Sequence, residues 1–109
     1  MVGVTTSQTS DTPGLSPAVH KFLRALASET RQRVMLLFAS GGEHTVGAVA
    51  ELTGIAQSTA SEQLAQLRDG GLITSRREGK TVYYRADQAA ILATLGELSS
   101  FLRSCCSSE

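Results

Sequence analysis

The chain has 109 residues, of which 41% are hydrophobic and 18% are charged. This length suits one domain, and the composition is unlike that of a disordered chain or a membrane-spanning chain. Ten Lys and Arg balance ten Asp and Glu, and a net charge of zero argues against a generic polyanion binder. The N-terminus shows no basic region followed by an apolar one, so we expect no secretory signal. Two adjacent cysteines cannot form a disulfide framework, so we expect a cytoplasmic domain.

The two ends of the chain differ in composition from the rest. Residues 1–14 are rich in Ser and Thr and end in Pro13-Gly14, which is typical of a disordered tail. An arm that becomes ordered on a partner is the alternative. We expect one domain over residues 15–106 and a short tail over residues 107–109.

Two helices are predicted at the start of this domain. Ser16-Pro17 supplies an N-cap and a proline in the first helical position. Ser28 caps the second helix, with Glu29 in its first turn, and Gly41-Gly42 ends it. Apolar residues at helical spacing form their buried faces, which are Val19, Phe22, Leu23 and Leu26 in the first helix and Val34, Leu37 and Phe38 in the second.

A helix-turn-helix is predicted next. Residues 44–46 are β-prone, and a compact helix follows that Gly54 stops in a tight turn. The second helix is expected from about Gln57 to Arg68, with Gly70-Gly71 ending it. Their inward positions are Val49, Ala50 and Leu52 in the first helix and Ala60, Leu64 and Leu67 in the second.

A β-hairpin and a last helix complete the domain. Residues 72–75 and 81–84 read as strands, joined by a polar turn over residues 76–80 that contains Gly79. Asp87 caps a helix of roughly 16 to 19 residues. The predicted fold is mainly α, an α+β winged helix in which a helix-turn-helix precedes a β-hairpin wing.

The helix that begins at Gln57 carries hydroxyls and amides where a solvated face normally carries Lys and Glu. Such groups donate to phosphates and read base edges in the major groove of DNA. A capping turn rich in Ser and Thr is the alternative. The residues expected to face outward are Gln57, Ser58, Thr59, Ser61, Glu62, Gln63 and Gln66.

The hairpin favours DNA over that alternative. Four cations lie on or beside it with Glu78 as the one acid among them, and such a ribbon can follow the phosphate backbone while a helix enters the groove. A solvated basic hairpin is the alternative. Over residues 56–85 five cations oppose three acids. The expected DNA-binding residues are Gln57, Ser58, Thr59, Ser61, Gln63, Arg68, Arg76, Arg77 and Lys80, with Arg85 as the fourth cation of the hairpin.

Three segments together resemble the ArsR/SmtB family of winged-helix repressors. They are STASEQLAQLRDGGLI at residues 58–73, RREGK at 76–80 and Tyr83-Tyr84, and ALASETR at 25–31 matches the start of the family's second helix. The resemblance covers residues 16–103. It implies a homodimer on a palindromic DNA operator, released by a metal or another signal. It also implies that Ser58, Ser61 and Gln63 read the groove, although many members carry His where Gln63 stands.

The last helix carries a heptad-like apolar seam suited to pairing with another helix. Packing on the protein's own core is the alternative. Because the family pairs its first and last helices between subunits, we expect a dimer that places two groove-reading helices roughly 34 Å apart. The seam is Ile91, Leu95, Leu98, Leu102 and Cys105, and the expected interface is Val19, Phe22, Ile91, Leu95, Leu98 and Leu102.

Two metal sites known in the family are missing. Residues 46–52 contain no Cys, so the cysteine site of the third helix is absent. The Asp and His site of the last helix is not intact either, because Ala89 stands two residues after Asp87 and no His occurs beyond His44. His20 with Cys105 and Cys106 remains, a set compatible with zinc, nickel, copper, cadmium, mercury or arsenic. The same thiols suit a disulfide or persulfide switch, or have no sensing role. We interpret His44 and Glu43 as a loop pair.

Other functional classes have less support. An enzyme would need a pocket with an oxyanion loop and a group that orients the base, and no such motif or phosphate-cradling glycine motif occurs. A winged helix that binds a second protein is the stronger rival. The zero net charge favours it, whereas the Ser- and Gln-rich helix and the basic hairpin oppose it. We predict a sequence-specific transcriptional regulator.

Overall fold

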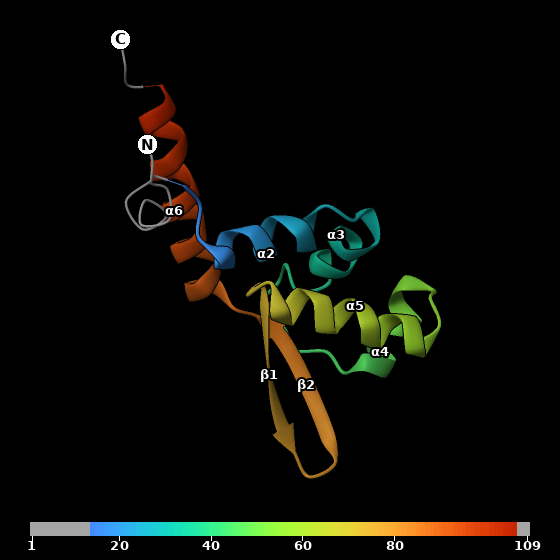
Figure 1. The fold of residues 1–109 in the computed structure, drawn as a ribbon. Coiled ribbons are helices and arrows are strands. Elements are labelled where there is room, and N and C mark those ends of the chain that lie inside the picture. Colours follow the sequence, from blue (N-terminus) through green and yellow to red (C-terminus); the bar gives the residue numbers. More distant parts are fainter. Residues whose placement is uncertain (1–13, 107–109) are drawn as a thin grey trace.

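The elements follow the predicted order, with a helix-turn-helix before a β-hairpin (Figure 1). The computed structural model describes residues 14–106, so the tails expected at 1–13 and 107–109 lie outside the described residues. The elements are α2 (Pro17–Leu26), α3 (Glu29–Leu36), α4 (Val46–Thr53), α5 (Gln57–Asp69), β1 (Ile73–Glu78), β2 (Thr81–Ala86) and α6 (Gln88–Cys105).

Side-chain caps begin four of the five described helices. The hydroxyl of Ser16 accepts a hydrogen bond from the Val19 amide, and Ser28 does the same for α3. Thr45 and Asp87 cap α4 and α6 in the same way. These caps were predicted except at Thr45, and they satisfy amide groups that a helix cannot pair internally. In contrast, α5 begins at Ala56 with no side-chain cap.

The core forms where four elements pack against α5. Its inward residues Ala60, Leu64 and Leu67 are fully buried, as predicted. They belong to one cluster with side chains from α2, α3, α4 and the start of β1. Phe38 lies just after α3 and Leu72 just before β1. The other members of the cluster are Phe22, Ala25, Val34, Phe38, Val49, Leu72 and Ile73.

Several predicted buried positions differ in the structure. Leu52, expected to point inward, is 60% exposed, because α4 uses the face that carries Val49 and Ala50, and Leu52 lies on the other side of Val49 around the helix. Leu23 is exposed for a similar reason, being about 100° from Phe22.

Val19 and Phe22, expected at the dimer interface, are buried within the single subunit. They therefore belong to its own core instead of a surface open to a second subunit.

Gly70 permits the close approach of α2 to the end of α5. A Cβ atom at this position would lie 2.8 Å from the Cβ of Ala25 and 3.0 Å from the carbonyl oxygen of Lys21. Those separations are shorter than van der Waals contact, so any larger residue would push the two helices apart. The glycine pair predicted to end α5 thus also fixes how tightly α2 packs on it.

The hairpin is longer than predicted and its turn is shorter. Glu78 pairs with Thr81, which leaves only Gly79 and Lys80 in the turn. Gly79 has φ +64, the left-handed conformation that suits a two-residue hairpin turn between twisted strands. Arg76, Arg77 and Glu78 are therefore strand residues. Successive strand residues point to opposite faces, so Arg76 and Arg77 lie on opposite sides of the ribbon.

A short bridge ties the hairpin to the segment before α4. The amide of His44 donates to the carbonyl of Tyr84 at 2.9 Å, and the amide of Tyr84 donates back at 2.8 Å. This agrees with the β-prone character predicted for residues 44–46.

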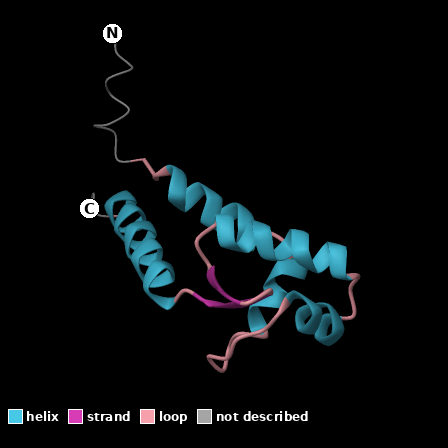
Figure 2. Ribbon diagram, turned by 90° about the horizontal axis from the view of Figure 1, so that it is seen from below, coloured by secondary structure: helices cyan, strands magenta, loops and turns pink. Residues whose placement is uncertain are grey.

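Helix α6 stands apart from the rest of the fold. It extends away from the other helices in both views (Figures 1 and 2) and has no buried residue along its 18 positions. It contacts α2, and Glu97 accepts a hydrogen bond from the Ser16 amide at 3.2 Å. No helix within residues 14–106 is long and apolar enough to cross a membrane.

Candidate nucleic-acid interface

The exposed surface of α5 is polar but narrower than predicted. Gln57, Ser58, Ser61, Glu62 and Gln66 are exposed. Thr59 and Gln63, also expected to face outward, are half-buried. At 100° per residue, Gln63 lies only about 60° around the helix from buried Ala60. The face that a partner can reach directly therefore centres on Ser58 and Glu62.

The start of α5 leaves backbone donors available beside these side chains. Because no side chain caps this helix, the amide groups of its first turn keep their hydrogen-bonding capacity. Those amides and the positive end of the helix dipole favour an anion. Together with the exposed Ser58 and Ser61 hydroxyls, they form a set of donors suited to a phosphate backbone.

Arg31 was missed by the sequence analysis and holds Gln63 in place. Its Nη1 donates to Oε1 of Gln63 at 3.0 Å, while Nε donates to the carbonyl of Ala25 at 2.7 Å and Nη2 to that of Arg24 at 3.2 Å. One guanidinium thus joins the end of α2 to the middle of α5. A signal was present, because Arg31 lies in the first turn of α3, where the helix dipole disfavours a cation.

Arg76 is committed to contacts within the protein. It makes a two-pronged ion pair with Glu43, with Nε to Oε2 at 2.9 Å and Nη2 to Oε1 at 2.8 Å. Its Nη1 also donates to Glu78 at 3.1 Å, and its guanidinium lies 4.6 Å from the ring centroid of Tyr83. We call the Arg76–Glu43 pair the wing clasp. It joins the hairpin to the segment that precedes α4.

The wing clasp shifts the pKa values of both partners in the direction that favours their charged forms. The hydrogen bond from Arg76 holds the pKa of Glu43 below its ordinary value of 4.5, and the same contact raises the pKa of Arg76. Glu43 lies outside the segment over which five cations oppose three acids. Counted with the wing, it supplies a fourth acid, so the local positive surplus is smaller than the sequence indicated.

The other wing cations have fewer contacts. Within residues 14–106, the side chains of Arg77 and Lys80 make no hydrogen bond or ion pair, and both are exposed at the tip of the hairpin. Arg68 donates to the hydroxyl of Ser75 at 3.3 Å, which places it beside the base of the hairpin. Arg85 is also exposed, on β2. The cations open to a phosphate are thus Arg68, Arg77, Lys80 and Arg85, and Arg76 is not among them.

The structure does not gather the expected sensing residues in one subunit. His20, Cys105 and Cys106 are all exposed, and both thiols are free. In the described part of the chain, no three His, Cys, Asp or Glu side chains lie close enough to share a metal ion. The predicted pairing of His44 with Glu43 was wrong, because Glu43 binds Arg76 and the His44 ring lies 2.9 Å from the Leu37 carbonyl.

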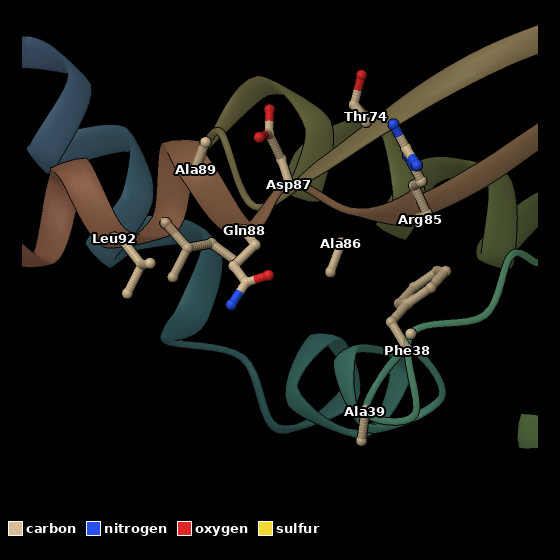
Figure 3. A pocket seen from close by; sticks show the side chains of 11 residues that line it. Phe38, Ala39, Thr74, Arg85, Ala86, Asp87, Gln88, Ala89 and Leu92 are labelled. Atoms are coloured by element: carbon tan, nitrogen blue, oxygen red, sulfur yellow. The ribbon is translucent and has the colours of Figure 1, made fainter.

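A cavity of about 690 Å³ lies between the end of α3, the base of the hairpin and the start of α6 (Figure 3). Phe38 and Ala39 line one side, and Gln88 and Leu92 of α6 line another. The side chain of Asp87 is occupied as the cap of α6. The cavity thus lies where the hairpin continues into α6.

We expect Glu43→Gln to destabilise the protein at neutral pH but not in acid. The folded state holds the pKa of Glu43 below 4.5. The carboxylate therefore adds to the free energy of unfolding at pH values above its pKa in the unfolded chain. That contribution is lost as the pH falls through its pKa in the folded protein. Urea unfolding of both proteins at about pH 7 and about pH 3 measures this difference.

Glu51→Gln is the matched control, because Glu51 is exposed on α4 and makes no ion pair with the described residues. Its unfolding midpoint should follow that of the wild type at both pH values. A gap between wild type and Glu43→Gln that is the same at both pH values would contradict the contribution of the wing clasp.

Comparison with known proteins agrees with this architecture. The general family of helix-turn-helix domains matches residues 26–76. The nodulation protein NolR of Rhizobium meliloti is 37% identical, in an alignment that covers 72% of this chain and 63% of NolR. The arsenic resistance transcriptional regulator ArsR1 of Pseudomonas putida is 42% identical over 57% of this chain and 48% of its own. The aligned part thus spans less than two thirds of either relative.

A solved structure matches over nearly the whole chain. It is a homodimeric winged helix-turn-helix DNA-binding domain from Mycobacterium bovis, described as a possible ArsR-family transcriptional regulator. It is 31% identical, covers 92% of this chain and 90% of its own, and has a TM-score of 0.66. The fold, the element order and these identities lead to one assignment. The chain belongs to the ArsR family of winged helix-turn-helix transcriptional regulators.

Proposed function

We propose that this chain is a homodimeric, sequence-specific DNA-binding regulator. The observation that carries the proposal is the uncapped first turn of α5, with Ser58 and Ser61 exposed beside it. A helix of this kind enters the major groove with its first turns against the base edges. It is followed by a hairpin whose tip carries two unpaired cations, as expected for a wing along the phosphates.

The residues divide into groups with different roles. In this proposal Gln57, Ser58 and Ser61 contact bases or phosphates, which their exposure supports, and Thr59 and Gln63 contribute from the half-buried flank of the same helix. Arg68, Arg77 and Lys80 neutralise phosphates, and Arg76 fixes the wing through its clasp with Glu43. The exposed Glu62 repels phosphates. Binding therefore depends more on a matched operator than on charge alone.

The same proposal includes pairing of subunits through α6. Leu95 and Leu102 are 44% and 53% exposed, and with Leu98 and Cys106 they line a groove of about 440 Å³ along this helix. Burial of such a stripe stabilises an association of two helices. Leu98 is half-buried, and Ile91, one turn before Leu95, packs partly against the core of its own subunit. The Mycobacterium bovis relative is a homodimer, so the occupant we propose is a second copy of this chain.

Arg77→Ala should weaken DNA binding and lower its salt dependence by about one unit of slope per subunit, the effect of one lost phosphate contact. Arg76→Ala should leave that slope unchanged, because Arg76 is held by Glu43. The measurement is fluorescence anisotropy at several salt concentrations on a duplex selected by the wild type from a randomised library. Ser61→Ala should instead lower the preference for that duplex over an unrelated one.

Arg33→Ala, a change at an exposed arginine of α3, controls for loss of one positive charge. Equal slopes for the Arg77 and Arg33 variants would remove the proposed role of the wing. A wild-type protein that retains no duplex from the library would overturn DNA binding altogether.

Leu95→Glu combined with Leu102→Glu should convert the dimer to a monomer and reduce operator affinity, because two carboxylates would be desolvated in the paired stripe. Sedimentation equilibrium measures the mass. Leu36→Glu is the control, since Leu36 is exposed on α3, away from this stripe. A double variant that keeps the dimer mass would exclude α6 as the interface.

We also propose that a chemical signal acts at Cys105 and Cys106, as a metal or metalloid ion or as an oxidant. The support is that both thiols are free and exposed, and that Cys106 borders the stripe on α6. Ligands from one described subunit do not complete a metal site. A metal site with His20 therefore requires the second subunit, whereas a disulfide or persulfide requires only thiols.

Zinc, nickel, copper(I), cadmium, mercury, arsenite, a persulfide donor and the thiol oxidant diamide should each be titrated into the protein–DNA complex. We expect release by at least one of them and no release from a Cys105→Ser, Cys106→Ser variant. His20→Ala should abolish only a metal response. Wild-type binding that none of these agents changes would refute sensing at the thiols.

A further inference from the structure

We propose that Arg31 fixes the Gln63 amide with its oxygen toward the protein, so that this residue of α5 presents its NH₂ group to DNA as a donor. The inference rests on the proposed DNA-binding function and adds to it the chemical group that this side chain uses to read a base. A free glutamine presents both a carbonyl oxygen and an NH₂ group to a partner. Here the carbonyl oxygen is held toward the protein, since it accepts from Nη1 of Arg31 at 3.0 Å.

The orientation of the Gln63 amide follows from the chemistry of its partner. Arginine carries only donors, so the atom that faces it must be the oxygen and not the NH₂ group. Arg31 is itself fixed by two further bonds, to the carbonyls of Ala25 and Arg24 at the end of α2. The guanidinium therefore cannot turn away without leaving these carbonyls.

The NH₂ group of Gln63 is open to a partner. It makes no hydrogen bond to the described residues. Every buried side-chain nitrogen or oxygen within residues 14–106 has a hydrogen-bond partner. The NH₂ group of Gln63 has none, so it is not buried and solvent reaches it. Around the helix Gln63 lies about 60° from exposed Gln66, so its free donor sits at the edge of the polar surface of α5.

An amide that presents only its NH₂ group reads DNA differently from a free glutamine. Two-pronged recognition of adenine requires the oxygen to accept from N6 while the NH₂ group donates to N7. With the oxygen held toward Arg31, the NH₂ group of Gln63 can donate to O6 and N7 of guanine, N7 of adenine, O4 of thymine or a phosphate oxygen. At adenine the neighbouring N6 donor would then lack the glutamine oxygen as its acceptor, so we expect this residue to favour guanine or thymine at the position it contacts.

Gln63→Glu is the sharpest test, because it replaces only the NH₂ group with an oxygen and keeps an acceptor for Arg31. Gln66→Glu is the matched control, since it adds the same negative charge on the neighbouring exposed position. The full chain and both variants are used to select duplexes from a randomised library, and the selected sequences are compared. Thermal unfolding of each variant confirms that it folds.

Both variants should bind more weakly through repulsion of phosphates. Only Gln63→Glu should lose the guanine or thymine preference at one position of each half-site, by about fivefold, which corresponds to one net hydrogen bond. Arg31→Met should free the oxygen and move the preference at the same position toward adenine. If Arg31→Met does not fold, the comparison of Gln63→Glu with Gln66→Glu still tests the inference.

Identical base profiles for the Gln63 and Gln66 variants would overturn the inference while leaving DNA binding intact. An adenine preference that already exists in the wild type and depends on Gln63 would also overturn it. A wild-type protein that enriches no sequence refutes the proposed function itself, a result distinct from both.

Discussion

The fold depends on the burial of one apolar face of α5. Ala60, Leu64 and Leu67 are fully buried, and α2, α3, α4 and β1 all contact this helix. A 13-residue helix has little stability of its own in water, so α5 holds its orientation through these neighbours. The opposite face of α5 does not pack in the core. That face can carry Ser58 and Ser61, which are weak helix formers.

Much of this arrangement could be predicted because its signals are local. Helix caps at Ser16, Ser28 and Asp87 and the apolar spacing of α5 depend on residues within one or two turns. The glycines that end α4 and α5 act in the same way. The predicted turn of the hairpin was too long, because a polar Arg-Arg-Glu run reads as a loop, whereas cross-strand pairing and Gly79 extend the strands.

The contacts that define the candidate site could not be predicted, because they join residues far apart in the sequence. Arg31 and Gln63 are 32 positions apart, and Arg76 and Glu43 are 33 apart. A count of charges treats every arginine alike, whereas the structure separates cations held by the protein from those open to a partner. Arg76 is held and Arg77 is open, although they are adjacent, because strand residues alternate between faces.

Helix α6 has a thermodynamic consequence beyond its role in pairing. It places no buried residue in its own subunit, so most of the apolar area it could bury becomes available only when a second chain arrives. Stabilisation of the folded state by such an association increases with protein concentration, because the fraction of paired subunits increases. Under the proposed pairing through α6, the stability and assembly of this protein therefore depend on its own concentration.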